Sequence, residues 1–437
     1  MNKMGEDMRT KCLRAAVVRD GLGAGFVEKS ERSKSERSMP STKPLSILAT
    51  VFLLGLAACT GSQKGCQLVP CSGNCPAILP TPEFLYATSS NHVLAFTIDE
   101  SSGALSAPLV AAGPNQSTGM VPSMDGQLYV SDFLNNEVDG YSISSSGALT
   151  AVPTSPFSLE GTPPGAGGLS PFVQGGTYLY ATDLNAGTVA GFLVDANSAT
   201  LTPIPGSPFP AGNTPVQAVQ AAPEASSSLF LYVSNLNDSA GGISAYTINQ
   251  QNGALSPISG SPFPTGAPGS FPGPSAMVVS VDNNFLYVAL VGTANANNKI
   301  AAFSIDPTTG SLTALPQSPF TTGNDPLQMA YVPLTANSQG FLYTANVQDG
   351  TISAFTADDT TGVLTPVNGS PYTSGTSVWG LSQILTSSGN FFLYAADPQA
   401  KTVTTYSINP NTGALTPLQG SPFTAGSEPM LLTITTQ

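Results

Sequence analysis

A Leu-Tyr pair recurs seven times along this chain, and its regular spacing restricts the fold more than any other feature. The pairs begin at Leu85, Leu128, Leu179, Leu231, Leu286, Leu342 and Leu393. They are 43, 51, 52, 55, 56 and 51 residues apart. A period of this size predicts a propeller or a solenoid, in which each repeat buries its apolar face against its neighbours.

The sixth repeat shows the structure that we expect of one unit. Phe341–Ala345 is short and aromatic-rich, which is typical of a buried strand. Asn346–Gly350 then supplies residues that tolerate the left-handed backbone of a tight hairpin. Thr351–Thr356 and Leu364–Val367 are the predicted second and third strands. A fourth strand precedes the later Leu-Tyr pairs and is clearest at Met277–Val281, Gln328–Val332 and Leu381–Leu385.

Two short motifs mark the ends of these strands. In five units an Asp or Asn is followed four residues later by Gly, which suits a hairpin with glycine at a positive φ. These pairs are Asp99/Gly103, Asn249/Gly253, Asp306/Gly310, Asp358/Gly362 and Asn409/Gly413, whereas the third unit carries Ala199 at the glycine position. The third strands end in Ser-Pro-Phe or Ser-Pro-Tyr, at Ser155, Ser207, Ser261, Ser318, Ser370 and Ser421. Because proline cannot donate to a β-ladder, we expect it on an outer edge strand, where it also blocks edge-to-edge pairing.

The two ends of the repeat region complement each other. The first unit lacks the strand before its Leu-Tyr pair, since only the proline-rich Cys75–Pro82 precedes Phe84. The chain instead ends in Pro429–Thr436, a copy of that strand with no Leu-Tyr pair after it. We therefore predict an all-β, seven-bladed propeller of four-stranded blades, in which the C-terminal strand completes the first blade.

The N-terminal region predicts export and lipid anchoring. Residues 39–58 form a secretory signal peptide, with Lys43 before the apolar run Leu45–Ala58. This run is shorter than the roughly 20 residues that span a bilayer as a helix. Leu56-Ala57-Ala58-Cys59 resembles the bacterial lipobox, whose cysteine becomes the lipidated first residue of the mature protein. The alternative is an ordinary signal peptide in which Cys59 is incidental.

The regions on either side of the signal peptide have separate expected roles. Residues 1–38 are charged and without apolar period, which fits a misassigned start or a genuine cytosolic extension. Residues 59–82 form a flexible tether that follows the lipid, and residues 83–437 form the propeller. Because residue 60 is Thr and not the Asp associated with inner-membrane retention, we expect an outer-membrane lipoprotein, periplasmic or surface-exposed. The tether cysteines, Cys66, Cys71 and Cys75, predict one disulfide whose pairing the sequence leaves open.

Charge excludes some classes of partner. Residues 1–58 hold ten of the 13 basic residues and six of the 26 acidic ones, so residues 59–437 keep three lysines, no arginine and a formal net charge of −17. Such a surface has no basic patch for nucleic acid, and nucleic acid is excluded as a partner. The expected partners are the membrane, through the lipid, and a glycan, peptide or envelope protein; we expect a monomer without a cofactor.

Polar residues follow most Leu-Tyr strands directly and form one candidate site. They are Asp132, Asp183, Asn235, Asn346 and Asp397. If the blades are equivalent, these side chains form a ring near one rim, and the carboxylates of Asp132, Asp183 and Asp397 supply hard oxygen ligands for Ca²⁺. The alternative is that each caps its own hairpin turn, which also requires the residue to repeat with the fold.

A second candidate site lies where the inner strands begin. Pro215-Val216-Gln217 and Pro326-Leu327-Gln328 share a pattern, and Ser377-Val378-Trp379 stands in the equivalent place. At a channel mouth, the only Trp beside Gln217 and Gln328 predicts a platform for a sugar or lactone. The alternative is packing between blades. His92, the only His, belongs to a turn of the first unit and lacks a nearby carboxylate in the sequence to orient it as a base.

The repeats themselves resemble a known family. LYVSNLNDSAGGISAYTI, LYTANVQDGTISAFTAD and LYAADPQAKTVTTYSINPNTGALTP are similar to the lactonase family of seven-bladed propellers, which includes 6-phosphogluconolactonases and borders on YVTN-repeat surface proteins. The resemblance implies the fold and a lactone hydrolase with its site at the channel mouth. A phosphorylated lactone, however, needs Arg or Lys around its phosphate. Two function classes therefore stand: an envelope binding or scaffold module, and a lactone hydrolase.

Overall fold

A computed structural model describes residues 83–435, except 112, 115, 124, 173–176, 225–226, 238–241, 266–272, 292–297 and 334–338. The predicted signal peptide, Cys59 and the tether cysteines Cys66, Cys71 and Cys75 lie outside the described residues. Within them, no helix has the length and apolar character needed to cross a bilayer.

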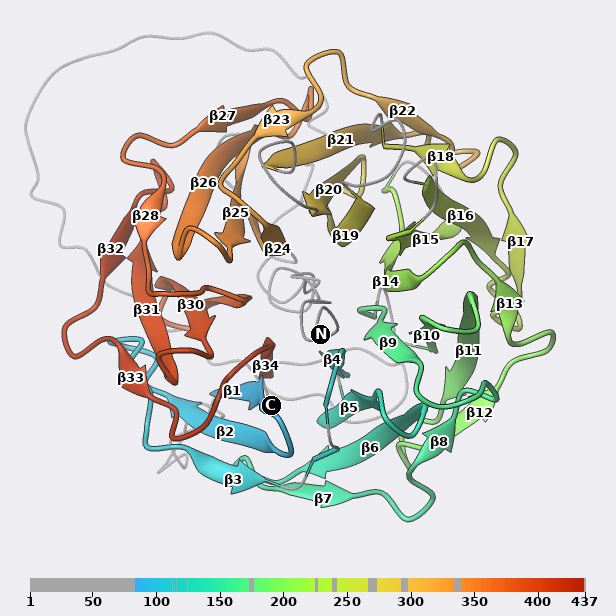
Figure 1. Ribbon diagram of the computed structural model, residues 1–437, viewed down its shortest axis with the longest axis horizontal. Helices are drawn as coiled ribbons and strands as arrows, with labels where there is room; N and C mark the ends of the chain where they lie inside the picture. The colour runs from blue at the N-terminus through green and yellow to red at the C-terminus, as the bar shows by residue number, and fades with distance from the viewer. Residues whose placement is uncertain are drawn as a thin grey trace, which may run out of the picture. The chain divides into compact units, whose positions relative to one another are not determined.

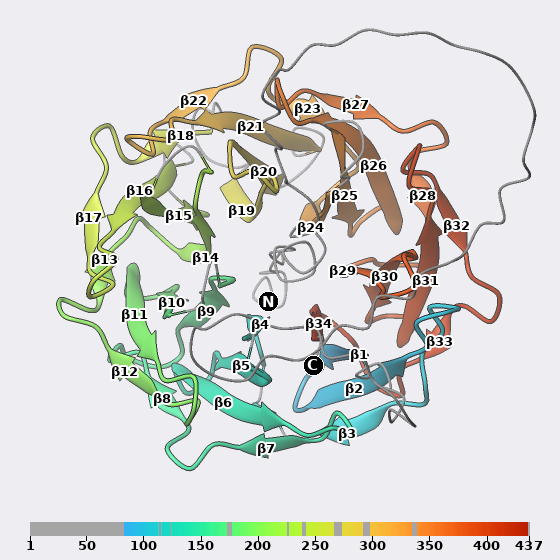
Figure 2. The same cartoon turned by 180° about the vertical axis from the view of Figure 1, so that it is seen from behind.

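Seven antiparallel sheets stand around a common axis, each with one strand nearest the centre (Figure 1; Figure 2). The sixth blade is representative and contains β24 (Pro326–Pro333), β25 (Gln339–Asn346), β26 (Thr351–Asp358) and β27 (Leu364–Pro366) in that order from the inside outwards. The register places Tyr343 opposite Ala330 and Ala354. The predicted four-stranded unit is confirmed.

The other blades repeat this arrangement with the following bounds. Blade two has β4 (Met120–Pro122), β5 (Gln127–Asp132), β6 (Glu137–Ile143), β7 (Leu149–Ala151) and β8 (Phe157–Ser158). Blade three has β9 (Ala166–Leu169), β10 (Tyr178–Asp183), β11 (Thr188–Val194), β12 (Leu201–Pro203) and β13 (Phe209–Pro210). Blade four has β14 (Pro215–Ala221), β15 (Leu229–Asn235), β16 (Gly242–Ile248), β17 (Leu255–Pro257) and β18 (Phe263–Pro264). Blade five has β19 (Gly273–Val279), β20 (Phe285–Val291), β21 (Lys299–Ile305), β22 (Leu312–Ala314) and β23 (Phe320–Thr321). Blade seven has β29 (Gly380–Leu385), β30 (Phe391–Asp397), β31 (Thr402–Ile408), β32 (Leu415–Pro417) and β33 (Phe423–Thr424).

The first blade joins both ends of the described chain. It contains β1 (Glu83–Thr88), β2 (Val93–Ile98) and β3 (Leu109–Ala111), and its inner strand is β34 (Leu432–Thr435). β34 pairs antiparallel with β1, with Ile434 opposite Leu85 and Thr433 opposite Tyr86. The predicted closure of the ring by the C-terminal strand is therefore confirmed.

The outer strand of a blade is interrupted where the sequence places Ser-Pro. In blade six, β27 and the two-residue β28 (Tyr372–Thr373) both pair with β26, and Ser370-Pro371 lies between them. The Ser370 hydroxyl accepts a hydrogen bond from the backbone N of Ala354 (2.9 Å). This N–H of β26 therefore has a hydrogen-bond acceptor where the outer strand is interrupted. Proline was expected at the end of one continuous outer strand; the structure instead divides that strand into two pieces, β27 and β28.

A belt of tyrosine hydroxyls links every blade to the next. Each Tyr of a Leu-Tyr pair donates to a backbone carbonyl in the hairpin between the third and outer strands of the following blade. The bonds are Tyr86 to Gly147 (2.8 Å), Tyr129 to Ala199 (3.1 Å), Tyr180 to Gly253 (2.7 Å), Tyr232 to Gly310 (2.8 Å), Tyr287 to Gly362 (3.1 Å), Tyr343 to Gly413 (2.8 Å) and Tyr394 to Gly103 (3.1 Å). The last bond returns from blade seven to blade one, so the belt is closed. This role explains why the Tyr is repeated.

The same hairpins explain the exceptional Ala199. At Gly413, which has a φ of 71°, an added Cβ would lie 2.5 Å from the ring of Phe341 in the preceding blade. An aromatic residue precedes every Leu-Tyr pair except the second, where Gln127 stands. The hairpin that receives Tyr129 from that blade is the one that carries Ala199, at a φ of 59°. Alanine is accommodated where the aromatic ring is missing.

Candidate functional site

The turns after the Leu-Tyr strands and the starts of the inner strands lie at one end of the ring. We call this end the entry face. These turns and strand starts share one end because the strands pair antiparallel: the end of β25 at Asn346 lies opposite the start of β24 at Pro326. Both predicted sites belong to this face.

Asp397 fixes a turn and the loop that enters its own blade. Its carboxylate accepts hydrogen bonds from the backbone N of Thr376 (2.6 Å) and Ser377 (3.2 Å) in that loop. It also accepts one from the backbone N of Ala400 (2.9 Å) in the turn. Asn235 acts similarly, since its side-chain oxygen accepts from the backbone N of Gly212 (3.0 Å).

Asp132 and Asp183 also cap their own turns. Asp132 accepts from the backbone N of Asn135 (3.0 Å), and Asp183 accepts from the backbone N of Ala186 (2.9 Å). Asp183 further accepts from the side-chain amide of Asn136 (2.9 Å) in the neighbouring blade. The structure does not bring Asp132, Asp183 and Asp397 together, and the described part of the chain holds no group of three or more His, Cys, Asp or Glu suited to a metal ion. These contacts support the turn-capping interpretation.

Blade two differs from its neighbours in carrying two further carboxylates, on β6, next to the turn that Asp132 caps. Glu137 lies opposite Asp132 in the hairpin, and Asp139 follows two residues later on the same face of β6. Burial, followed by the charges of Asp132 and Glu137, raises the pKa of Asp139 to about 6. The corresponding residue in blade six is Ser353, whose hydroxyl accepts from Asn346 (2.9 Å). The carboxylate pair of Glu137 and Asp139 was not predicted from the sequence, although its two-residue spacing on a strand was visible there.

Gln217 and Gln328 are fully buried between blades, with an exposed fraction of 0%. The side-chain oxygen of Gln217 accepts from the backbone N of Met277 in blade five (2.6 Å). That of Gln328 accepts from the backbone N of Leu381 in blade seven (2.7 Å). Both amides therefore join the inner strand of one blade to that of the next, which supports the alternative of packing between blades.

Trp379 occupies a different place from the two glutamines. Gln217 lies opposite Ser234, the third residue after Leu231, whereas Gly380 lies opposite Ala396, the third residue after Leu393. Gly380 is therefore the counterpart of Gln217, and the predicted equivalence of Trp379 is wrong by one residue. A shift of one residue turns a side chain to the other face of a strand. The indole N–H of Trp379 donates to the hydroxyl of Ser377 (2.9 Å), and its ring is partly exposed.

Trp379 belongs instead to a continuous group of apolar side chains, which we call the apolar arc. Its members are Leu236, Val291, Leu327, Val347, Trp379, Met430 and Leu431. Each lies directly at the end of a second strand or at the start of an inner strand, so the arc follows the entry face from blade four to the first blade. Leu236, Val347, Trp379 and Met430 are partly exposed. The arc was not predicted from the sequence, where its signal was the apolar residue that directly follows Asn235 and Asn346.

His92 lies on the same face, in the turn of the first blade. Its Nε2 lies 3.1 Å from the hydroxyl of Ser427 and its Nδ1 lies 2.6 Å from the side-chain oxygen of Asn91. Among the described residues, the hydrogen-bond partners of His92 are amides and hydroxyls. The ring therefore helps to hold the segment that leads into β34.

Solved structures support the same fold. A putative 6-phosphogluconolactonase from Bacteroides uniformis is 18% identical, with a TM-score of 0.63, and the match covers 81% of this chain and 100% of that one. One from Bacteroides fragilis is 17% identical, with a TM-score of 0.63 and coverage of 82% and 99%. A periplasmic gluconolactonase from Pseudomonas aeruginosa is 18% identical, with a TM-score of 0.61 and coverage of 81% and 99%. At these identities the likeness shows the fold alone.

A family profile identifies the chain more firmly than these structures do. No curated protein matches the sequence significantly. The profile described as "Lactonase, 7-bladed beta-propeller" matches residues 73–379, and the structure continues the same repeat through β34. The chain therefore belongs to the lactonase family of seven-bladed β-propellers.

Proposed function

We propose that this protein is a binding module of the cell envelope that uses its entry face to hold a ligand or a protein partner. The observation that carries the proposal is the apolar arc with the partly exposed Trp379. Partly exposed apolar side chains gathered at one place are typical of interaction sites, and a lone Trp is a frequent anchor. The rest of the entry face is fixed by turn caps such as Asp397, so it presents a rigid frame.

The charge of the propeller supports binding over hydrolysis of a phosphorylated lactone. Residues 83–437 contain 20 acidic residues and two basic ones, Lys299 and Lys401. Lys401 lies 3.7 Å from Glu428, and the ammonium of Lys299 donates to the hydroxyl of Thr321 (2.7 Å). A dianionic phosphate approaching this surface is repelled.

Lactone hydrolysis is the second candidate, favoured by membership of the family. It applies best to a neutral lactone, which the negative charge does not repel. The decisive assay measures hydrolysis of 6-phosphogluconolactone and of neutral lactones by the purified protein, with and without Ca²⁺. Turnover of the phosphorylated lactone well above the spontaneous rate contradicts the binding proposal. Turnover of neutral lactones alone, abolished by Trp379→Ala, assigns hydrolysis to the entry face.

The proposal includes an anchor at Cys59 and a place at the outer membrane. Its support is the lipobox-like sequence Leu56-Ala57-Ala58-Cys59. Mass spectrometry of the mature N-terminus tests it. A protein that begins at an acylated Cys59 agrees with the anchor, whereas an unmodified Cys59 or retained residues 1–58 contradict it.

A further inference from the structure

The first blade differs from the other six at its outer edge. In blades two to seven, Ser-Pro interrupts the outer strand, and each serine hydroxyl accepts a hydrogen bond of 2.8 to 3.0 Å from a backbone N of the third strand. These serines are Ser155, Ser207, Ser261, Ser318, Ser370 and Ser421. In the first blade no Ser-Pro lies between β2 and β4, and β3 forms the outer edge (Figure 1). This edge therefore lacks the motif that blocks edge-to-edge pairing in the other blades.

The register shows which residues replace the motif. The third strands of blades one and two align through the tyrosines of their Leu-Tyr pairs, which lie opposite Ala95 and Gly140. Two residues before these positions, β2 pairs with Ala111, and β6 pairs with the Phe of Ser155-Pro156-Phe157. Leu109-Val110-Ala111 therefore takes the place of Ser-Pro-Phe, and Val110 stands where the other blades have proline.

Val110 restores a backbone N–H that proline lacks, and this group points outwards. The N–H of Thr97 donates to the hydroxyl of Ser106 (2.9 Å), and its C=O accepts from the backbone N of Ser106 (3.0 Å), so both groups of Thr97 face the outer strand. Because these groups alternate along a strand, those of Ala95 also face outwards, whereas those of Leu94 face β1. Val110 lies opposite Leu94. Its own N–H and C=O therefore point away from the sheet.

The side chains of β3 are unusually apolar for a surface strand. Val110 is 66% exposed and Leu109 is 48% exposed, which makes them the two most exposed large apolar side chains in the described part of the chain. Pro108 directly precedes β3 and limits the free edge to these three residues. An exposed apolar edge strand with an outward N–H is suited to pairing with another strand.

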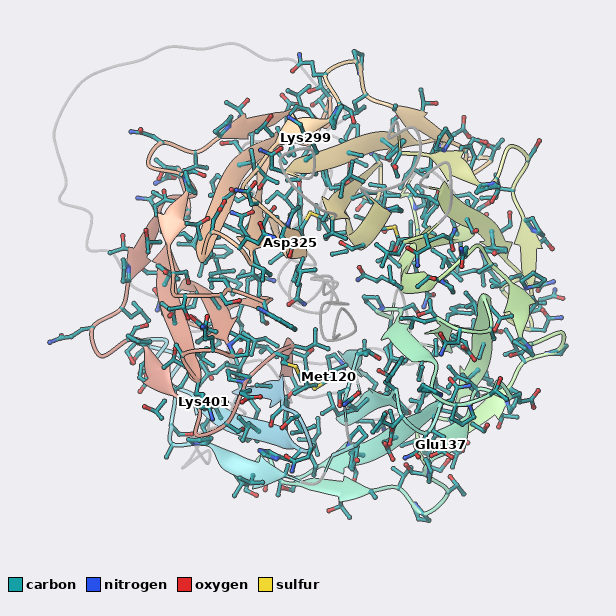
Figure 3. The ribbon with its side chains drawn as sticks, in the orientation of Figure 1. Met120, Glu137, Lys299, Asp325 and Lys401 are labelled. Atoms are coloured by element: carbon teal, nitrogen blue, oxygen red, sulfur yellow. The ribbon has the colours of Figure 1, made fainter. Side chains whose placement is uncertain are left out.

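The charges around β3 favour a second copy of this chain as its partner. Residues 103–114 contain no charged side chain. The two lysines of the propeller, Lys299 and Lys401, lie in blades five and seven (Figure 3). A strongly charged partner strand therefore finds no opposite charge along this edge. A second β3 offers what the edge requires, namely an outward N–H and C=O and uncharged apolar side chains.

We propose that β3 pairs antiparallel with β3 of a second copy, so that the two first blades form one continuous sheet. A two-fold axis at Val110 places it opposite Val110 of the second copy, with two N–H···O=C bonds between them, and places Leu109 opposite Ala111. Three residues from each copy bury far less than the roughly 1,200 Å² of a stable interface, so the dissociation constant is on the order of 100 µM. The dilute protein remains the monomer that we expect from the sequence. The entry face takes no part in this pairing, which is independent of the proposed binding function.

Sedimentation equilibrium of the purified protein tests the association. Between about 5 and about 500 µM, a range that brackets this dissociation constant, the average mass should rise from that of one chain towards that of two. The association should strengthen as salt is raised, because residues 83–437 carry 20 acidic and two basic residues and salt screens the repulsion between copies. Hydrogen exchange of the Val110 amide should slow with protein concentration, since the pairing buries this N–H.

Variants of Val110 test the strand pairing itself. Val110→Pro restores the residue of the other blades and removes the outward N–H, and Val110→Lys places two like charges opposite each other. Each should raise the dissociation constant at least about tenfold. The matched control is Leu193→Lys. It adds the same charge at an apolar side chain that is 43% exposed, but on β11, which β10 and β12 flank on both sides. This control should leave the dissociation constant unchanged.

Four results overturn the inference. The first is a mass that stays that of one chain up to about 500 µM at high salt, several times the expected dissociation constant. The second is an association that survives both Val110→Pro and Val110→Lys, because another surface then carries it. The third is an equal loss with Leu193→Lys, which assigns the effect to general surface character. The fourth is exchange of the Val110 amide that does not depend on concentration while the mass rises.

Discussion

The contact between Gly413 and Phe341 gives a quantitative test of how the blades fit together. Gly413→Ala places a Cβ 2.5 Å from the Cδ1 atom and 2.7 Å from the Cε1 atom of Phe341. Displacing the aromatic ring of Phe341 costs about 1–3 kcal/mol by analogy with overpacked cores. The φ of 71° costs alanine about 1–2 kcal/mol more. The smaller conformational entropy of the unfolded alanine variant returns about 0.4–1 kcal/mol, so we expect a net loss of about 1–5 kcal/mol.

Urea unfolding, followed by circular dichroism, measures this loss. The natural control is Ala199→Gly: no aromatic ring precedes Leu128, so this change relieves the φ of 59° and is expected to be neutral or stabilising by up to about 1 kcal/mol. Phe341→Gln recreates the Gln127 arrangement, and in that background Gly413→Ala should cost about 1–3 kcal/mol less than in the native protein. An equal cost in both backgrounds refutes the clash as the cause.

Three further predictions test other parts of the ring. Burial, then the charge of Glu100, raises the pKa of Glu83 from 4.5 to about 8, so the folded state favours the protonated carboxyl and the free energy of unfolding falls as pH rises through this interval. Glu83→Gln should remove this loss, which amounts to up to about 5 kcal/mol between pH 5 and pH 9 in urea titrations. An unchanged pH dependence in the variant contradicts the prediction. Tyr343→Phe leaves the Gly413 carbonyl without its tyrosine donor and should lower the free energy of unfolding by about 1–3 kcal/mol in the same urea measurement. An unchanged free energy of unfolding contradicts the tyrosine belt as a source of stability. Deleting residues 429–437 removes the inner strand of the first blade, and calorimetry should show a lower melting temperature for the whole ring; an unchanged temperature is incompatible with closure by β34.

The parts of this structure that the sequence predicts are those that repeat. Seven Leu-Tyr pairs and one displaced strand were enough to predict the blades and their closure. The place of Trp379 could not be predicted in the same way, because the pairing of β14 and β24 shifts register near Pro215 and Pro326, whereas that of β29 with β30 does not. The roles of Gln217 and Gln328 were also hidden, since strand periodicity tells which face a residue occupies and not which backbone group of the next blade it meets.

The tyrosine belt also has a consequence for the order in which the chain folds. Six of its seven bonds join residues 61 to 78 positions apart, whereas the bond from Tyr394 to Gly103 spans 291. The six short connections let successive blades dock as neighbours. The long connection costs only about 1 kcal/mol more in loop-closure entropy than a short one, so closing the ring adds little to the free-energy cost of folding. The first blade nevertheless has no inner strand until the last residues of the chain arrive. During synthesis from the N-terminus, β1 therefore keeps an unpaired edge for the whole time that the other six blades are made, and this edge is the point at which the nascent chain is most exposed to wrong pairing.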